Sequence, residues 1–200
     1  MTTDILEFPN LIPPRFADEI EQAMTSIEFP WYFRENVSSQ PGDPAVLTND
    51  PNIKIRDAFI HLFYDTKWNI ESQFAPLIKP LLYFIEKATG LRVVNVMRMR
   101  AVLTYRDPNW NEEHYLTPHV DDISPEHTHT LVYYVNDCDG DTFFYDELYT
   151  EWNNYNKRTL IKRFTPTKGT GVLFNGHRYH GNGVGRLHNR IVINMNLTLE

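Results

Sequence analysis

The chain has 200 residues, 42% of them hydrophobic and 22% charged, which is enough for one globular domain with its own core. The formal net charge of −7 argues against a general affinity for nucleic-acid backbones, and the single cysteine, Cys138, excludes an intrachain disulfide. Residues 1–10 lack a basic leader, and no apolar run of about eighteen residues occurs. We therefore expect a cytoplasmic protein that does not span a membrane.

The first ninety residues predict mainly helices. Apolar residues recur at helical spacing over 16–27, directly after two prolines that can start a helix. The segment 53–64 fits a strand or a helix. A second helical pattern covers 69–89, where Asn69 can cap the start, Gly90 can end the helix, and two internal prolines predict a kink or a split.

After Gly90 the apolar residues follow a period of two, which is typical of strands. In the segment from Arg92 to Tyr105, Met99 and Leu103 share one face with Tyr105, whereas Arg98 and Arg100 lie on the other. The further strand candidates are Thr130–Asn136, Thr142–Tyr145, Gly171–Phe174 and Arg190–Thr198. This order predicts an α+β fold, in which a β-sandwich or barrel is buttressed by helices on one sheet. We expect a single domain over 1–200, with helical support in 1–90 and the β-core in 91–200.

The sequence His119-Val120-Asp121 places two candidate metal ligands two residues apart. On a strand, positions i and i+2 point to the same side, so an imidazole and a carboxylate could reach one ion. Alone the pair is weak evidence, because a surface turn carrying a coincidental His and Asp has the same sequence.

The strand that begins at Arg190 has two different faces. Ile191, Ile193, Met195 and Leu197 form an apolar face, and the opposite face carries Arg190, Val192, Asn194, Asn196 and Thr198. A guanidinium buried in a β-rich core requires an anion, and a carboxylate matches its geometry. An edge strand with its polar face in water, or an internal salt bridge, is the alternative.

Two histidines and one carboxylate that leave open positions describe the facial triad of non-heme Fe(II) oxygenases. His180 precedes Arg190 by ten residues. Together with His119 and Asp121, these residues resemble the Fe(II)/2-oxoglutarate-dependent dioxygenase superfamily, in its prolyl-4-hydroxylase-like branch, over residues 96–197. The resemblance implies a double-stranded β-helix (jelly-roll, cupin-like) fold whose major sheet is buttressed by N-terminal helices. It also implies that His119, Asp121 and His180 are the metal ligands.

The resemblance further implies the residues that hold the co-substrate. Arg190 matches the arginine that binds the distal carboxylate of 2-oxoglutarate. Tyr134, in "LVYYVND", matches a tyrosine that hydrogen-bonds the same carboxylate. Tyr105, in "AVLTYRD", would face the co-substrate pocket, and Thr130 is a further candidate. The segments "DGDTFFYD" and "PTKGTGVLFNG" resemble neighbouring strands of the same fold, with Asp139 in place of a glycine.

Other histidines compete for the metal. His177 lies three residues before His180, but the spacing from His180 to Arg190 fits the resemblance better. His188 lies too close to Arg190, and His127 and His129 are expected in a loop or at the surface.

The activity implied by the resemblance uses Fe(II), 2-oxoglutarate and O2, and leaves ascorbate open as an auxiliary reductant. It would hydroxylate an unactivated C–H bond of a prolyl, peptidyl or amino-acid substrate and release succinate and CO2. Expected partners are a peptide, a protein or a small molecule, chosen by loops 37–52 and 107–117. Nucleic-acid dealkylation ranks lower, because that branch carries a second arginine where this chain has Asn196. A non-catalytic jelly-roll module and a zinc hydrolase are the remaining alternatives, and the zinc hydrolase gives Arg190 no role.

Overall fold

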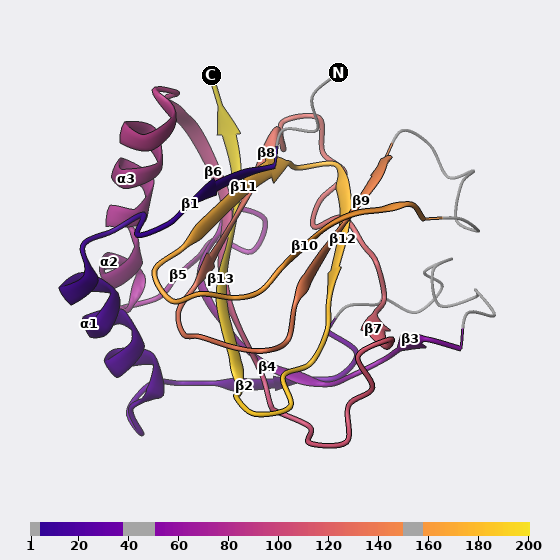
Figure 1. Cartoon of the computed structure of the whole chain (residues 1–200). Helices are drawn as coiled ribbons and strands as arrows, with labels where there is room; N and C mark the ends of the chain where they lie inside the picture. The colour runs from indigo at the N-terminus through magenta and orange to yellow at the C-terminus, as the bar shows by residue number, and fades with distance from the viewer. Residues whose placement is uncertain (1–4, 38–50, 150–157) are drawn as a thin grey trace.

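The computed structural model describes residues 5–37, 51–149 and 158–200. In these residues, a large antiparallel sheet lies between a layer of helices and a smaller sheet (Figure 1). None of the helices in the described ranges has the length and apolar character that crossing a bilayer requires.

The large sheet has eight strands, and the small sheet has three. The large sheet runs in the order β1 (Leu6–Phe8), β11 (Gly171–Asn175), β8 (His129–Tyr134), β13 (Arg190–Leu199), β6 (Val93–Thr104), β4 (Ala58–Asp65) and β2 (Tyr32–Arg34), with β5 (Ile70–Glu71) paired to β4. The small sheet runs in the order β10 (Leu160–Phe164), β9 (Thr142–Leu148) and β12 (Arg178–Asn182), and a short parallel pair joins β3 (Ile53–Lys54) to β7 (Tyr115–Leu116). The two longest strands, β6 and β13, pair in the middle of the large sheet and form its rigid centre.

The described residues form the helices α1 (Pro14–Thr25), α2 (Ala75–Ile78) and α3 (Pro80–Thr89). Proline opens α1 and α3, where its missing N–H costs no intrahelical hydrogen bond. The expected split of the second helical segment is confirmed, and Gly90 ends α3 in the left-handed conformation with φ 74°. Asn69 was wrong as a cap, since it lies at φ 49° in the turn before β5.

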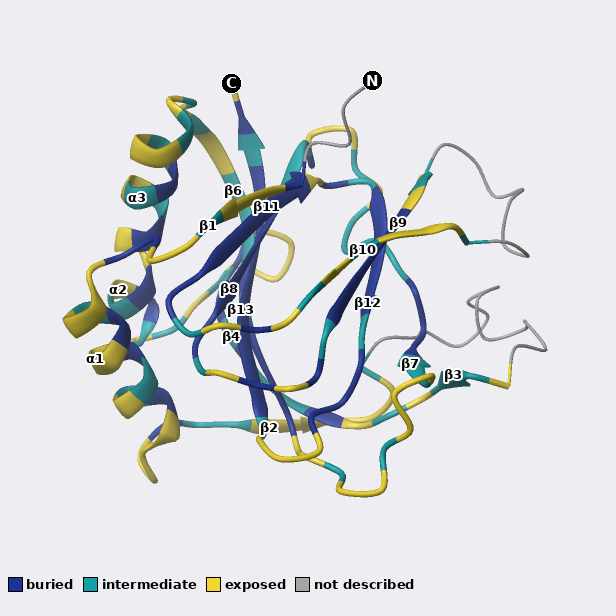
Figure 2. Ribbon diagram, viewed as in Figure 1, coloured by how far each residue is buried: buried dark blue, intermediate teal, exposed yellow. Residues whose placement is uncertain are grey.

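The outer face of the large sheet forms the main apolar core with the helices. Ile20 of α1 and Ile85 of α3 belong to the same buried cluster as Met99 and Ile193 of the central strands. Figure 2 shows the buried side of each helix turned toward the sheet and the exposed side turned outward. This shared core supports our proposal that residues 1–200 form one domain.

The inner face of the large sheet packs against the small sheet. Val102, Val132 and Val192 lie in a second buried cluster with Phe144 of β9. Because both faces are covered, every residue of β13 except Thr198 is buried. Any polar side chain that points inward here is therefore shielded from bulk water.

The prediction that the first ninety residues are mostly helical was wrong. The ambiguous segment 53–64 contains β4, which pairs with β6 through Phe59–Leu103 and Ile60–Val102. β2 extends the sheet further, and β1 pairs with β11 at the opposite edge. The sheet decides the conformation of β4, because its neighbour β6 supplies a ladder of hydrogen bonds that the isolated segment lacks.

Candidate metal and carboxylate site

Three candidate metal ligands from two distant parts of the chain meet between the two sheets. His119 follows β7, and His180 lies in β12. Their backbones form an isolated antiparallel bridge, in which the N–H of His119 donates to the carbonyl of His180 at 2.8 Å and the reverse bond measures 3.0 Å. One ligand atom each from His119, Asp121 and His180 lies within 4.8 Å of the others. The predicted triad therefore converges on one point.

The two imidazole rings are oriented by backbone carbonyls. Nδ1 of His119 donates to the carbonyl of Thr117 at 3.0 Å, and Nδ1 of His180 donates to the carbonyl of Arg178 at 3.1 Å. These bonds leave both Nε2 atoms directed toward the carboxylate of Asp121, at 3.9 and 3.8 Å. A hydrogen bond from the second ring nitrogen is the usual support of a metal-binding histidine.

Charge and burial prepare the triad for a cation. The side chain of Asp121 is 1% exposed, and its Oδ2 has no hydrogen-bond partner. Burial opposes ionisation of this carboxyl, but His180, Arg98 and Arg100 outweigh it and hold its pKa well below the usual range. Burial, reinforced by His119, lowers the pKa of His180 to about 4, so its imidazole is neutral near pH 7. An unpartnered carboxylate oxygen beside two imidazoles fits a divalent metal ion.

Arg190 provides a second polar centre in the same space. The residue is 4% exposed, and its Nη2 donates to the hydroxyl of Thr142 at 2.8 Å. The hydroxyl of Tyr134 donates to the same Thr142 oxygen at 2.8 Å. Nε of Arg190 has no partner, and among the described residues no carboxylate lies within salt-bridge distance of this guanidinium. A buried cation of this kind requires an anion from outside the chain.

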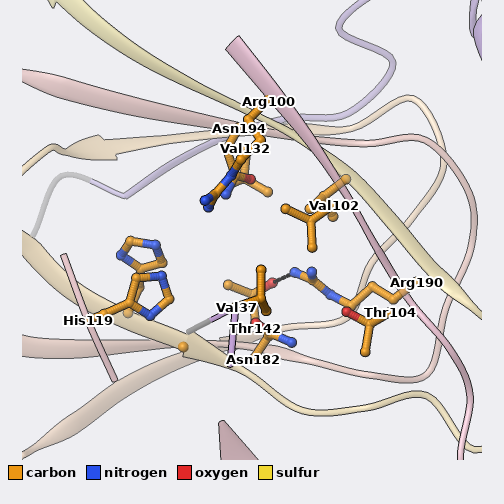
Figure 3. Close-up of a pocket in the computed structure, with 13 residues that line it drawn as sticks. Val37, Arg100, Val102, Thr104, His119, Val132, Thr142, Asn182, Arg190 and Asn194 are labelled. Atoms are coloured by element: carbon orange, nitrogen blue, oxygen red, sulfur yellow. Dashed lines mark hydrogen bonds between the residues drawn. The ribbon is translucent and has the colours of Figure 1, made fainter. Parts of the chain in front are cut away.

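Arg190 and the two histidines of the triad line one pocket (Figure 3). Its lining includes His119, His180, Arg190, Thr142, Thr104, Arg100, Asn182, Asn194 and the valines 37, 102, 132 and 192. His119 stands on one side and Arg190 on another, with Thr142 between them. A ligand with a metal-chelating end and a carboxylate end can therefore span the pocket.

Three predicted co-substrate residues, Tyr134, Tyr105 and Thr130, lie outside the pocket lining. Tyr134 reaches the pocket only through its hydrogen bond to Thr142. Tyr105 is 52% exposed and packs edge-on against Phe59, with 5.5 Å between ring centroids. Its neighbour Thr104 lines the pocket and pairs in register with Arg190. Because successive side chains of a strand point to opposite sides, Tyr105 points away from the pocket. Thr130 is buried but donates to Nε2 of His127, at 2.9 Å.

Sequence reasoning missed Thr142, which joins Arg190 to Tyr134. The residue stands in the quoted segment "DGDTFFYD", so the only available signal was a threonine at the start of a strand. Its importance depends on the contact between the two sheets, which no local pattern encodes.

The competing histidines have other partners. Nε2 of His177 donates to the carbonyl of Ser124 at 3.0 Å. His127 lies in the loop before β8, as expected, but it is 0% exposed, donates to the carbonyl of Asp122 and accepts a hydrogen bond from Asn196. His127 therefore secures the segment that follows Asp121, and it lies outside the triad.

No protein-family model matches the chain, and no curated protein matches it in sequence. Solved structures do match it, among them an oxidoreductase of the 2OG-Fe(II) oxygenase family from Burkholderia pseudomallei. That match has a TM-score of 0.64 and 12% identity, over 97% of this chain and 84% of the other. A Pseudomonas putida prolyl-4-hydroxylase matches with a TM-score of 0.55 and 11% identity, over 98% and 94%.

A non-heme α-ketoglutarate-dependent epimerase from nogalamycin biosynthesis matches with a TM-score of 0.57 and 11% identity, over 96% of this chain and 76% of the other. The structural neighbours are thus 2-oxoglutarate-dependent oxygenases, including prolyl hydroxylases. The chain has the jelly-roll fold of these enzymes, and the predicted fold class is confirmed.

Proposed function

We propose that the protein is an Fe(II)- and 2-oxoglutarate-dependent dioxygenase that hydroxylates an unactivated C–H bond. One observation carries the proposal: a buried arginine without an acidic partner lies in the same pocket as a converged His-Asp-His cluster. A group of metal-binding side chains alone fits many activities. The buried Arg190 beside it fits a co-substrate that ends in a carboxylate.

Each residue has a defined task in this reaction. His119, Asp121 and His180 would hold Fe(II) on one side and leave its other positions free. Arg190, with Thr142 and Tyr134, would bind the distal carboxylate of 2-oxoglutarate and so fix the orientation of the molecule. When bound, Fe(II) with 2-oxoglutarate and O2 would supply the oxidising power, and the co-substrate would leave as succinate and CO2.

The substrate classes suggested by the sequence remain a proposal, namely a prolyl or peptidyl group or an amino acid. A nucleic-acid substrate is disfavoured by the net charge of −7 and by Asn196, a buried amide engaged with His127. A zinc hydrolase would leave Arg190 without a role, and a non-catalytic module would bind the ligands without turnover.

The test is an anaerobic titration with Fe(II) and 2-oxoglutarate, followed by exposure to air. We expect the two ligands to bind together, to give a visible charge-transfer absorption band, and to yield succinate slowly without a prime substrate. Zn(II)-loaded protein serves as the control and should form no succinate. Failure to bind either ligand refutes the proposal, and binding without succinate favours the non-catalytic module.

A further inference from the structure

A second arginine enters the pocket from a different strand. Arg100 lies on β6, its side chain is 16% exposed, and it lines the pocket together with His119 and Arg190. Figure 3 shows the guanidinium of Arg100 entering the pocket from another side than that of Arg190. The proposed binding of 2-oxoglutarate by Arg190 gives Arg100 no task.

Among the residues that the structure describes, Arg100 has only a long ion pair, to Asp121. Its Nε makes no hydrogen bond, and the nearest carboxylate oxygen, Oδ1 of Asp121, lies 3.8 Å from Nη2. The same oxygen is closer to Nη2 of Arg98, at 3.4 Å. Asp121 therefore already has Arg98 beside it. A bound metal ion would also attract the negative charge of Asp121 and so weaken its interaction with Arg100.

Positive charge predominates among the groups that act most strongly on Arg100. Arg98 and Arg34 act on it as like charges, and Asp121 and Asp65 act as opposite charges. With Arg100 itself, these are three cations and two anions, before a divalent metal ion is added. The distal carboxylate of 2-oxoglutarate would be taken by Arg190 and the other would lie at the metal, so an additional anion would still be favourable.

Asn194 lies directly beside Arg100. The two residues pair in register between β13 and β6, and both line the pocket. Asn194 is 8% exposed, and its Oδ1 has no hydrogen-bond partner. A buried amide oxygen without a partner can accept an N–H or O–H group from a ligand. Val102, Val132 and Val192 complete this part of the lining and suit a short carbon skeleton.

We propose that Arg100 and Asn194 form a carboxylate-binding subsite for the prime substrate, which is then a small molecule with a free carboxylate and a nearby hydrogen-bond donor. A free amino acid or a hydroxy acid has this chemistry, whereas an internal residue of a polypeptide has no free carboxylate. The inference rests on the proposed function and narrows its substrate class.

The experiment uses protein loaded with Mn(II) and 2-oxoglutarate, and matched probes that differ only at the carboxyl group. The probes are L-proline and L-leucine, each compared with its primary amide, and relaxation of probe protons by Mn(II) reports binding near the metal. We expect at least one acid to bind about tenfold or more tightly than its amide. If neither acid binds better than its amide, the inference is overturned.

Substitutions assign the effect to Arg100. We expect Arg100→Met to remove the preference for the acid while the affinity for 2-oxoglutarate, measured by calorimetry, stays unchanged. Arg100→Lys keeps the charge and should restore part of the preference. Arg98→Met is the matched control, because Arg98 is on the same strand and closer to Asp121 but does not line the pocket. It should retain the preference.

Two results would contradict the assignment to the prime substrate. If Arg100→Met weakens 2-oxoglutarate as strongly as Arg190→Met does, then Arg100 binds the metal-proximal carboxylate of the co-substrate. If Arg98→Met acts like Arg100→Met, the effect is general electrostatics. If wild-type protein binds neither Mn(II) nor 2-oxoglutarate, the proposed function itself fails and the inference falls with it.

Discussion

The two faces of the large sheet differ sharply, although both are buried. On β13, Ile191, Ile193 and Met195 point into the core beneath the helices. Arg190 and Asn194 point the other way, into the pocket. Neighbouring residues of a single strand thus serve either packing or ligand binding, because successive side chains alternate between faces.

Hydrogen bonding shows the same difference. In the described part of the large sheet, five inward side-chain atoms are buried without a partner: Nε of Arg98, Arg100 and Arg190, and Oδ1 of Asn194 and Asn196. On the outward face the corresponding atom is the hydroxyl of Tyr133. Unpartnered polar groups oppose folding, so their concentration on one face indicates a surface built to receive a ligand.

The largest loss of ligand binding is expected for a metal ligand on the small sheet, which faces the inner side of the large sheet. His180→Ala should abolish binding of Fe(II), because the variant loses a ligand atom whose position the backbone fixes. His177→Ala is the matched control and should bind the metal as wild type does, since His177 contacts Ser124 instead. Anaerobic metal titration measures both, and the reverse outcome would identify His177 as the ligand.

The outer face should respond in stability alone. Ile193 is 0% exposed in the core beneath the helices, so Ile193→Ala should lower the free energy of unfolding by about 3 kcal/mol. Denaturant titration measures this loss. The folded fraction should bind 2-oxoglutarate with wild-type affinity, and a large change in that affinity would show that the two faces are not separable.

Substitution on the inner face should lower ligand affinity without a loss of stability. Arg190→Met should weaken 2-oxoglutarate about 100-fold, since a charge-assisted pair is lost, while Fe(II) still binds. Its free energy of unfolding should stay unchanged or rise, because a buried cation without an acidic partner is removed. Calorimetry and denaturant titration together provide the check. A loss of stability comparable to that of Ile193→Ala would contradict the proposed role of Arg190.

The alternation along β13 and β6 made the core face predictable from sequence, whereas the triad was implied by the family resemblance. The same alternation placed Tyr105 on the face of Met99 and Leu103, and the structure keeps it there. The resemblance had assigned it to the pocket, which Thr104 lines instead. Here the local period was a better guide than the family pattern.

What the sequence could not provide depends on contacts between distant segments. The ambiguous segment 53–64 becomes a strand because β6 lies beside it. His127 lies in a loop as expected, but its burial was not predictable, because three polar groups from other positions satisfy its ring. Arg98 and Arg100 could be placed on one face, but not beside Asp121, because the loop that carries Asp121 reaches them only in the folded chain.

The reciprocal backbone bonds between His119 and His180 have a consequence for how the site would acquire its ion. The main chain itself fixes the distance between the two imidazoles, so metal binding would need to order few additional residues. Association would then lose little conformational freedom, and the free energy of coordination would go mainly into affinity. The metal site would therefore be preorganised, and metal binding would not have to be coupled to folding.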